Sequence, residues 1–317
     1  MKKIVGLFIV LLALNGCDDG NLTIDNINFE DVVAKKCTIN NIIYKIKDSE
    51  ALILEIANSN NYFTNEPTND GEPIILTINN DNKVVYRAYN AEVADGNICA
   101  TIPLSTPNVK EEWVATSGTI EITTTANVVP NTATTSGNAT KISGYNHFIV
   151  LKNVTFNKPS GDQTYETFTF GSYSRPIIPL SLAFNPDNIA KCSTTNQVYN
   201  ISGKEAFVLN LDATFFPDAA GVKTDIISAT NKVTYKLFES NVTSSYFCVD
   251  PLPITPILSQ QWNAVDGVSG VSGIIEVVTT AVGSDFEHTI HLKKVTLKKG
   301  NNEFYLGDDY IYGTFLN

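Results

Sequence analysis

The sequence has little of several residue types on which common functional sites depend. Its 317 residues include three histidines and one methionine, which leaves little material for a histidine-based metal site. Its 22 basic residues are outnumbered by 33 acidic ones, giving a formal charge of −11. A nucleic-acid partner would require a basic footprint. We therefore expect no nucleic-acid partner, no metal and no cofactor.

The motifs of common enzyme chemistries are also missing. The chain has no G-x-S-x-G elbow, no phosphate-cradling loop, no clear calcium loop and no C-x-x-C pair. Glu121 and Glu276 occupy one equivalent strand position in each half, which is not the facing pair of acids that a glycosidase needs. His147 and His288 are equivalent to each other, and His291 points to the opposite strand face from His288. We predict structural histidines and no enzymatic activity, with a hydrolase as the less favoured alternative.

Long hydrophobic runs are absent after the N-terminus. Lys2 and Lys3 precede an apolar-plus-glycine run of eleven residues, Ile4 to Leu14. At about 1.5 Å per helical residue, this run is too short to span a bilayer core of about 30 Å. The pattern is typical of a secretion signal rather than of a membrane-spanning helix.

The residues after this run resemble the lipobox of bacterial lipoproteins, which here is Leu14-Asn15-Gly16-Cys17. The resemblance implies a signal peptide over residues 1–16 and a lipid-modified Cys17, carrying diacylglycerol and palmitate, at the start of a tether over residues 17–20. The lipid on Cys17 would attach the protein to the membrane. An ordinary signal peptide with an incidental cysteine is the alternative.

The acidic pair Asp18-Asp19 follows the cysteine directly. It is similar to the export tag of surface lipoproteins in the Bacteroidota, which implies an outer-membrane location facing the cell exterior. An aspartate at this place retains lipoproteins at the inner membrane in other Gram-negative bacteria, so a periplasm-facing protein is the alternative.

The rest of the chain is a tandem duplication of one unit. The matches occur in the same order in both halves, and Ser117 to Ala126 (SGTIEITTTA) agrees with Ser272 to Ala281 (SGIIEVVTTA) at seven of ten positions. Trp113 and Trp262 each follow a cysteine by fourteen residues. The period of about 150 residues is that of whole domains rather than of solenoid repeats. We predict domains over residues 21–173 and 177–317, with a linker at residues 171–176.

Both halves show strand patterns. Residues 82–89, 118–125 and 148–156 alternate in polarity and are rich in β-branched and aromatic side chains, and Asn, Gly, Pro and Ser clusters separate them. We predict an all-β protein made of two tandem antiparallel β-sandwiches, of Ig-like or Greek-key type, with seven to nine strands each. The tryptophans depart from the immunoglobulin pattern, because they follow both cysteines instead of lying between them.

Four further cysteines divide equally between the halves. Because the duplication preserves both members, we expect disulfides Cys37–Cys99 and Cys192–Cys248, in an export compartment where disulfides persist. Free core thiols and cross-domain bridges are the alternatives.

The two copies differ mainly in loops. The first copy is longer at residues 59–72 and again at residues 127–144. Binding residues concentrate in loops on a rigid scaffold, and the first of these loops holds Tyr62 and Phe63, an aromatic pair suited to stacking on a sugar or contacting a protein. Simple packing of this pair is the alternative.

The acidic tag, the paired cysteines and the Phe-bearing first strand (Asn28-Phe29-Glu30) together resemble uncharacterised surface lipoproteins of flavobacteria. That group supplies no catalytic or ligand-binding residues. We predict a non-enzymatic interaction or adhesion protein that contacts another envelope protein. The alternative is a glycan-binding, nutrient-capture lipoprotein.

Overall fold

The computed structural model describes residues 26–102, 104–193 and 195–316. The predicted signal peptide, Cys17 and the tether lie outside these residues. In the described part, no helix is long and apolar enough to cross a membrane. The described chain is all-β with antiparallel sheets, which confirms the predicted fold class.

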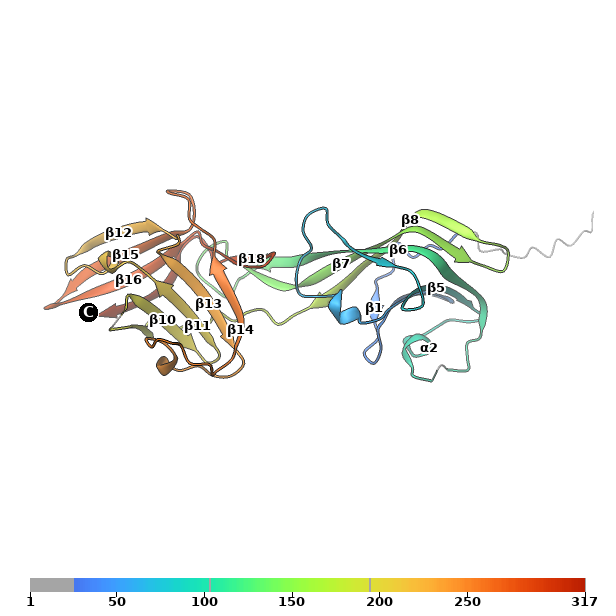
Figure 1. Ribbon diagram of the computed structural model, residues 1–317, viewed down its shortest axis with the longest axis horizontal. Coiled ribbons are helices and arrows are strands. Elements are labelled where there is room, and N and C mark those ends of the chain that lie inside the picture. The colour runs from blue at the N-terminus through green and yellow to red at the C-terminus, as the bar shows by residue number, and fades with distance from the viewer. Residues whose placement is uncertain (1–25, 103, 194, 317) are drawn as a thin grey trace, which may run out of the picture.

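The two halves lie end to end along the long axis of the molecule (Figure 1). The first half forms one eight-stranded sheet in the order β1-β2-β3-β5-β6-β7-β8, with β4 paired to β6. Its elements are β1 (Lys35–Lys36), β2 (Ile42–Lys47), β3 (Glu50–Ile56), η1 (Ser59–Asn61), β4 (Ile74–Thr77), β5 (Asn82–Tyr89), α2 (Asp95–Cys99), β6 (Val109–Pro130), β7 (Thr140–Asn157) and β8 (Gln163–Pro176). Residues 28–30, expected as a first strand, form none, although Phe29 is buried.

The second half forms a seven-stranded sheet, β18-β17-β14-β13-β11-β10-β9, and a four-stranded sheet, β12-β15-β16-β19. Its elements are β9 (Ile189–Lys191), β10 (Gln197–Ser202), β11 (Glu205–Asn210), η2 (Ala213–Phe215), β12 (Gly221–Ile226), β13 (Lys232–Phe238), η3 (Ser244–Tyr246), β14 (Leu258–Ala264), β15 (Ile274–Val282), β16 (Asp285–Lys293), β17 (Thr296–Lys299), β18 (Asn302–Tyr305) and β19 (Tyr310–Leu316). These eleven strands exceed the predicted seven to nine.

The extra strands arise because three long strands that are continuous but bent in the first copy are each interrupted in the second copy. The register of β6 shifts near Gly118, after which β6 leaves β5 and pairs with β4 instead. Gly118 has φ 117°, and a Cβ there would lie 2.8 Å from the carbonyl oxygen of Lys152. Only glycine fits so close to a neighbouring backbone. Three long strands thus pass from one layer of the sandwich to the other, whereas the second copy covers the same path with pairs of shorter strands.

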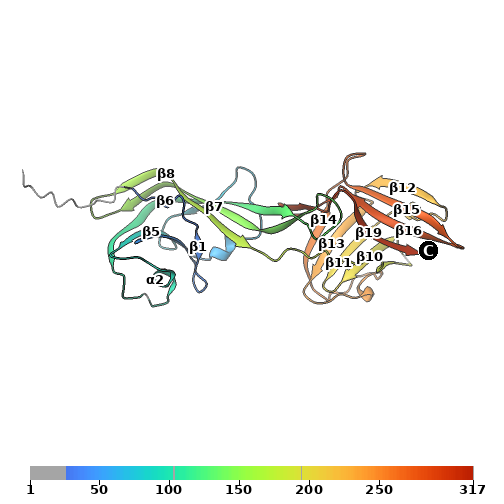
Figure 2. The same ribbon diagram turned by 180° about the vertical axis from the view of Figure 1, so that it is seen from behind.

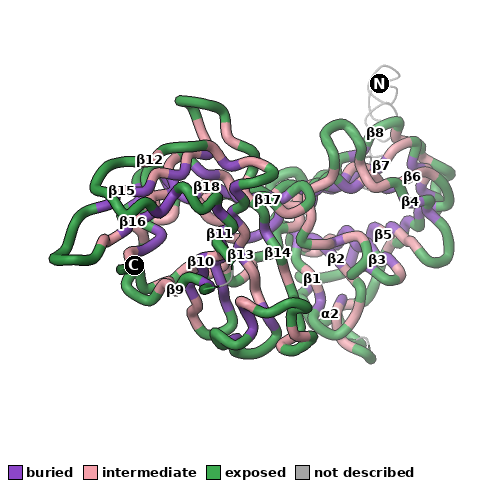
Figure 3. Tube along the Cα trace, turned by 60° about the vertical axis from the view of Figure 1, so that its left-hand side comes forward, coloured by how far each residue is buried: buried purple, intermediate pink, exposed green. Residues whose placement is uncertain are grey.

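Each half encloses its own apolar core between its two layers, where the buried residues gather (Figure 3). Tyr86 and Trp113 face each other across β5 and β6, and Tyr235 and Trp262 repeat the pair in the second half. All four side chains are buried. Each tryptophan is therefore a core residue of its own half.

The predicted linker is wrong in its position. Residues 171–176 form the end of β8 and pair with β7 as far as Pro176, opposite Gly144. The connection between the halves is instead the strand-free segment 177–188, rich in leucine and isoleucine, which packs partly onto the second core. Residues 171–174, Gly-Ser-Tyr-Ser, have the composition of a linker. Their glycine instead serves a bend within β8, where Gly171 has φ 101°.

Candidate functional site

The two long loops of the first copy meet the second half, where they build a joint. Figure 2 shows β7 and β8 reaching towards the second half. The loop at residues 59–72 contacts the turn between β17 and β18. Asn301 N donates to Glu66 Oε1 at 2.5 Å, and Asn302 Nδ2 donates to Glu66 Oε2 at 2.7 Å. One carboxylate thus accepts two hydrogen bonds across the joint.

Further bonds surround this carboxylate. Asn301 Nδ2 donates to the carbonyl oxygen of Pro67 at 2.9 Å, and the hydroxyl of Tyr145 donates to Asn302 Oδ1 at 2.8 Å. Gly300 lies so close to Glu66 that a Cβ there would overlap it. The turn is therefore fitted to the loop by both shape and polarity.

The second insertion, residues 127–144, forms the paired ends of β6 and β7 and the turn between them, and this turn contacts the chain between β18 and β19. The amides of Asp308 and Asp309 donate to the carbonyl oxygens of Gly137 and Ser136 at 2.9 and 3.0 Å. Ile142 and Tyr145 are buried in the core of the second half. These insertions, which the sequence suggested as free binding tips, join the two domains into one body.

The aromatic pair of the first loop is not a surface platform. Phe63 is 1% exposed and packs edge-on against His147 and Tyr173. Tyr62 is half-buried against the core of the first half. The prediction of an exposed sugar-stacking pair is corrected for Phe63, because η1 turns its side chain inward.

A cavity of about 190 Å³ lies at the joint. Its floor contains Tyr145, Trp262 and Phe304, all nearly fully buried. The connecting segment forms another wall through Ile177, Ile178, Leu180 and Leu182. The walls come from both halves and from the segment between them, so the cavity exists only when the joint is assembled.

Two lysines, Lys141 and Lys299, border this cavity. Lys299 Nζ lies 5.5 Å from the centre of the Trp262 ring, a cation–π contact. Among the residues that the structure describes, neither lysine has a carboxylate within ion-pair distance. In an acidic protein, this is a local concentration of positive charge beside apolar surface.

The first copy contains the same lysine–tryptophan pair in a different setting. Lys158 Nζ lies 4.9 Å from the Trp113 ring, and the indole donates to Glu111 Oε1 at 2.7 Å. In the second copy Gln260 replaces that glutamate and accepts from the Trp262 indole at 3.2 Å. A neutral amide therefore replaces the negative charge beside the tryptophan. The Glu66 carboxylate, already hydrogen-bonded by Asn301 and Asn302, lies on the far side of the cavity, where burial and this charge raise the pKa of Tyr145 to about 12.

Another exposed feature occurs in both copies. The post-cysteine loops, residues 100–108 and 249–257, follow Cys99 and Cys248. Ile102 is 83% exposed in the first loop and Ile254 is 91% exposed in the second. Leu104, Leu252 and Ile257 are also exposed, and the two loops together contain one charged residue, Asp250. Exposed branched apolar residues close together in the chain are candidates for an interaction site.

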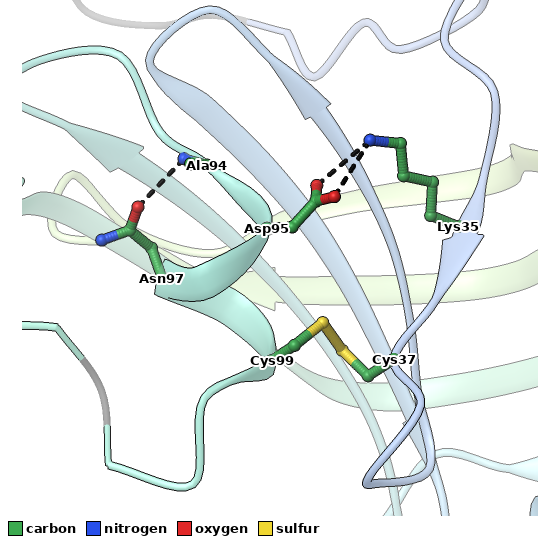
Figure 4. A network of polar contacts seen from close by, with 6 residues as sticks. All are labelled: Lys35, Cys37, Ala94, Asp95, Asn97 and Cys99. Carbon is green, nitrogen blue, oxygen red and sulfur yellow. Dashed lines mark hydrogen bonds and ion pairs between the residues drawn. A yellow bond between two sulfur atoms is a disulfide. The ribbon is translucent and has the colours of Figure 1, made fainter.

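Disulfides hold the start of each loop. Cys37–Cys99 and Cys192–Cys248 are both formed, as the duplication predicted. In the first half the bridge joins α2 to the chain after β1, and Lys35 Nζ pairs with Asp95 at 3.1 Å beside it (Figure 4). At the start of α2, the amide of Ala94 donates to Asn97 Oδ1 at 2.9 Å. The bridges thus anchor each loop to a sheet.

The three histidines have separate settings. His147 Nδ1 lies 2.8 Å from Thr124 Oγ1, and His288 Nδ1 lies 2.9 Å from Thr279 Oγ1. Both rings are fully buried, whereas His291 is near the surface beside Asp309 at 2.8 Å. Burial, with Arg175 and Lys36 nearby, lowers the pKa of His147 to about 4, and burial also lowers the pKa of His288. The repeated pair is a neutral core contact in each half.

The carboxylates singled out in the sequence do not form a facing pair. Glu276 accepts a hydrogen bond from Lys293 at 2.6 Å within the second half. Glu121 lies on β6 opposite Val150, in the first half. In the described part of the chain, no group of three or more His, Cys, Asp or Glu side chains is placed to hold a metal ion.

Sequence reasoning missed Lys141, Lys299 and the connecting segment as cavity residues. The sequence contains one sign of these residues. Beside the repeated tryptophan, the first copy has Glu111, whereas the equivalent position of the second copy is Gln260. Comparison of the chain with protein-family models, with curated proteins and with solved structures gave no match.

Proposed function

We propose that this chain is a non-enzymatic interaction protein of the bacterial envelope, anchored in the outer membrane through lipid on Cys17 and facing the cell exterior. The repeated post-cysteine loops carry the proposal. Each loop exposes branched apolar side chains on a disulfide-anchored base. Exposed apolar surface of this kind is typical of protein–protein contact.

The arrangement of the loops favours one partner that contacts both. Helix α2, which leads into the first loop, and the orange segment that follows β13 lie along the same long edge of the molecule (Figure 1). The joint holds the halves together through side-chain and main-chain bonds. Two contact sites on one molecule raise the affinity for a partner that engages both at once. The partner is therefore an envelope protein with two apolar patches.

A matched set of variants tests this function. The mature protein would be used to recover partners from solubilised outer membranes, together with Ile102→Ser/Ile254→Ser and the control Val222→Ser. Val222 is 64% exposed on β12, on the opposite long edge. We expect one partner to be recovered with wild type and control and reduced at least about fivefold with the double variant.

Two results would contradict the proposal. The same partner recovered equally well with the double variant would remove the loops from the contact. Reproducible hits on a glycan array, with no protein recovered, would favour the nutrient-capture alternative.

The anchor has its own test. Cys17→Ala should abolish incorporation of labelled fatty acid, because the lipid is attached to that side chain. Asp18→Ala/Asp19→Ala should retain the lipid but reduce protease accessibility on intact cells. A wild-type protein that never incorporates the label is not a lipoprotein, and unchanged accessibility would show that the acidic pair is not an export tag.

A further inference from the structure

We propose that the joint cavity, lined by Trp262, Phe304, Tyr145, Lys141 and Lys299, binds a small organic anion in which a short chain links an aromatic group to a carboxylate. The inference concerns the purified chain alone and does not depend on any protein partner.

The size of the cavity sets the size of the ligand. An apolar protein cavity of about 150 Å³ holds a benzene molecule. The joint cavity measures about 190 Å³. It therefore has room for one aromatic ring and a short chain.

The lining offers apolar and aromatic surface for a ring. Ile177, Leu180 and Leu182 of the connecting segment line the cavity together with the three aromatic residues. The lining has two neutral polar side chains, Asn65 and Gln260, and Gln260 accepts a hydrogen bond from the Trp262 indole. An aromatic ring would bury only apolar surface.

The charges favour an anion. Lys141 and Lys299 border the cavity, and among the described residues neither forms an ion pair. The first copy has Glu111 beside its tryptophan, where a carboxylate ligand would be repelled, and the second copy has the neutral Gln260. A carboxylate beside two ammonium groups at the edge of an apolar cavity forms charge-assisted hydrogen bonds, which are stronger than neutral ones.

Calorimetric titration of the mature protein with 3-phenylpropionate tests the proposal, with the uncharged 3-phenylpropan-1-ol as the matched ligand. We expect saturable one-site binding of the acid, about tenfold tighter than the alcohol, a difference that corresponds to about 1.4 kcal/mol. Lys141→Gln/Lys299→Gln should remove this preference while leaving the affinity for the alcohol unchanged. Lys158→Gln, at the equivalent pair of the first copy, should leave the affinities for both ligands unchanged.

A second variant distinguishes binding inside the cavity from simple attraction to the two lysines. Leu180→Phe, at a half-buried wall position, should narrow the cavity and weaken binding of acid and alcohol together. Equal affinity of wild type for acid and alcohol would overturn the anionic class of the ligand. Absence of saturable binding of both, or an equal loss with Lys158→Gln, would overturn the site itself.

Discussion

At the scale of single residues, Gly118 decides whether the first half can fold into two layers. Alanine there would place a Cβ 2.8 Å from the Lys152 carbonyl oxygen in a backbone conformation that L residues rarely adopt. We expect Gly118→Ala to lower the free energy of unfolding by more than about 2 kcal/mol. Gly161→Ala is the matched control, because Gly161 has φ 112° but nothing within 4 Å of its Cβ position. Equal losses in urea denaturation would show that the close approach has no effect.

The buried histidines make the stability depend on pH. The pKa of His147 is about 4 in the folded protein and about 6.5 in the unfolded chain, so the unfolded state binds the proton first as pH falls. The free energy of unfolding should therefore decrease from about pH 6.5 towards pH 4, by roughly 3 kcal/mol for this group. His147→Gln cannot titrate in this range. Urea denaturation between pH 7.5 and 4.5 should give a shallower pH dependence for the variant, and parallel curves would contradict the prediction.

At the scale of elements, the short helix α2 depends on its disulfide. The Cys37–Cys99 bridge closes a loop of 62 residues, and restricting the unfolded chain in this way contributes about 4 kcal/mol. We expect Cys37→Ser/Cys99→Ser to lose about that much stability in chemical denaturation. Lys35→Gln, which removes the exposed ion pair to Asp95 on the same helix, should cost less than about 1 kcal/mol. A bridge variant no less stable than the lysine variant would show that the disulfide is dispensable.

The elements also show what sequence could and could not predict. Alternation predicted strands at residues 118–125 and 148–156, because half-buried strands repeat with period two. The duplication predicted both disulfides, because each pair recurs at similar spacing. The joint escaped prediction, because the polar loop at residues 127–144 has the composition of a free tip and finds its partners about 170 residues away. Composition indicates that a loop is polar, but it does not identify what the loop contacts.

At the scale of the whole molecule, the joint converts two sandwiches into one body, and Glu66 is central to it. The carboxylate accepts from Asn301 N and Asn302 Nδ2, so Glu66→Ala removes the acceptor of the Asn301 amide and leaves Asn302 Nδ2 only the carbonyl oxygen of Asn65. We expect the variant to fold with unchanged β content but with a broader distribution of distances between the halves. Double electron–electron resonance between spin labels at Lys83 and Asp285, both exposed or half-buried strand-end positions, would measure that distribution.

The same loop offers a control of matched chemistry. Glu72 also accepts a side-chain hydrogen bond, from Asn69 Nδ2 at 2.7 Å, a contact within the first half. Asn69 Oδ1 accepts from Asn301 Nδ2 at 3.0 Å across the joint, and Glu72→Ala leaves both partners of that bond in place. Glu72→Ala should therefore leave the distance distribution as narrow as in wild type. Because the walls of the cavity come from both sides of the joint, Glu66→Ala should also weaken 3-phenylpropionate binding, whereas Glu72→Ala should not. A narrow distribution in Glu66→Ala would mean that the main-chain bonds of residues 136–137 to residues 308–309 suffice to hold the two halves together.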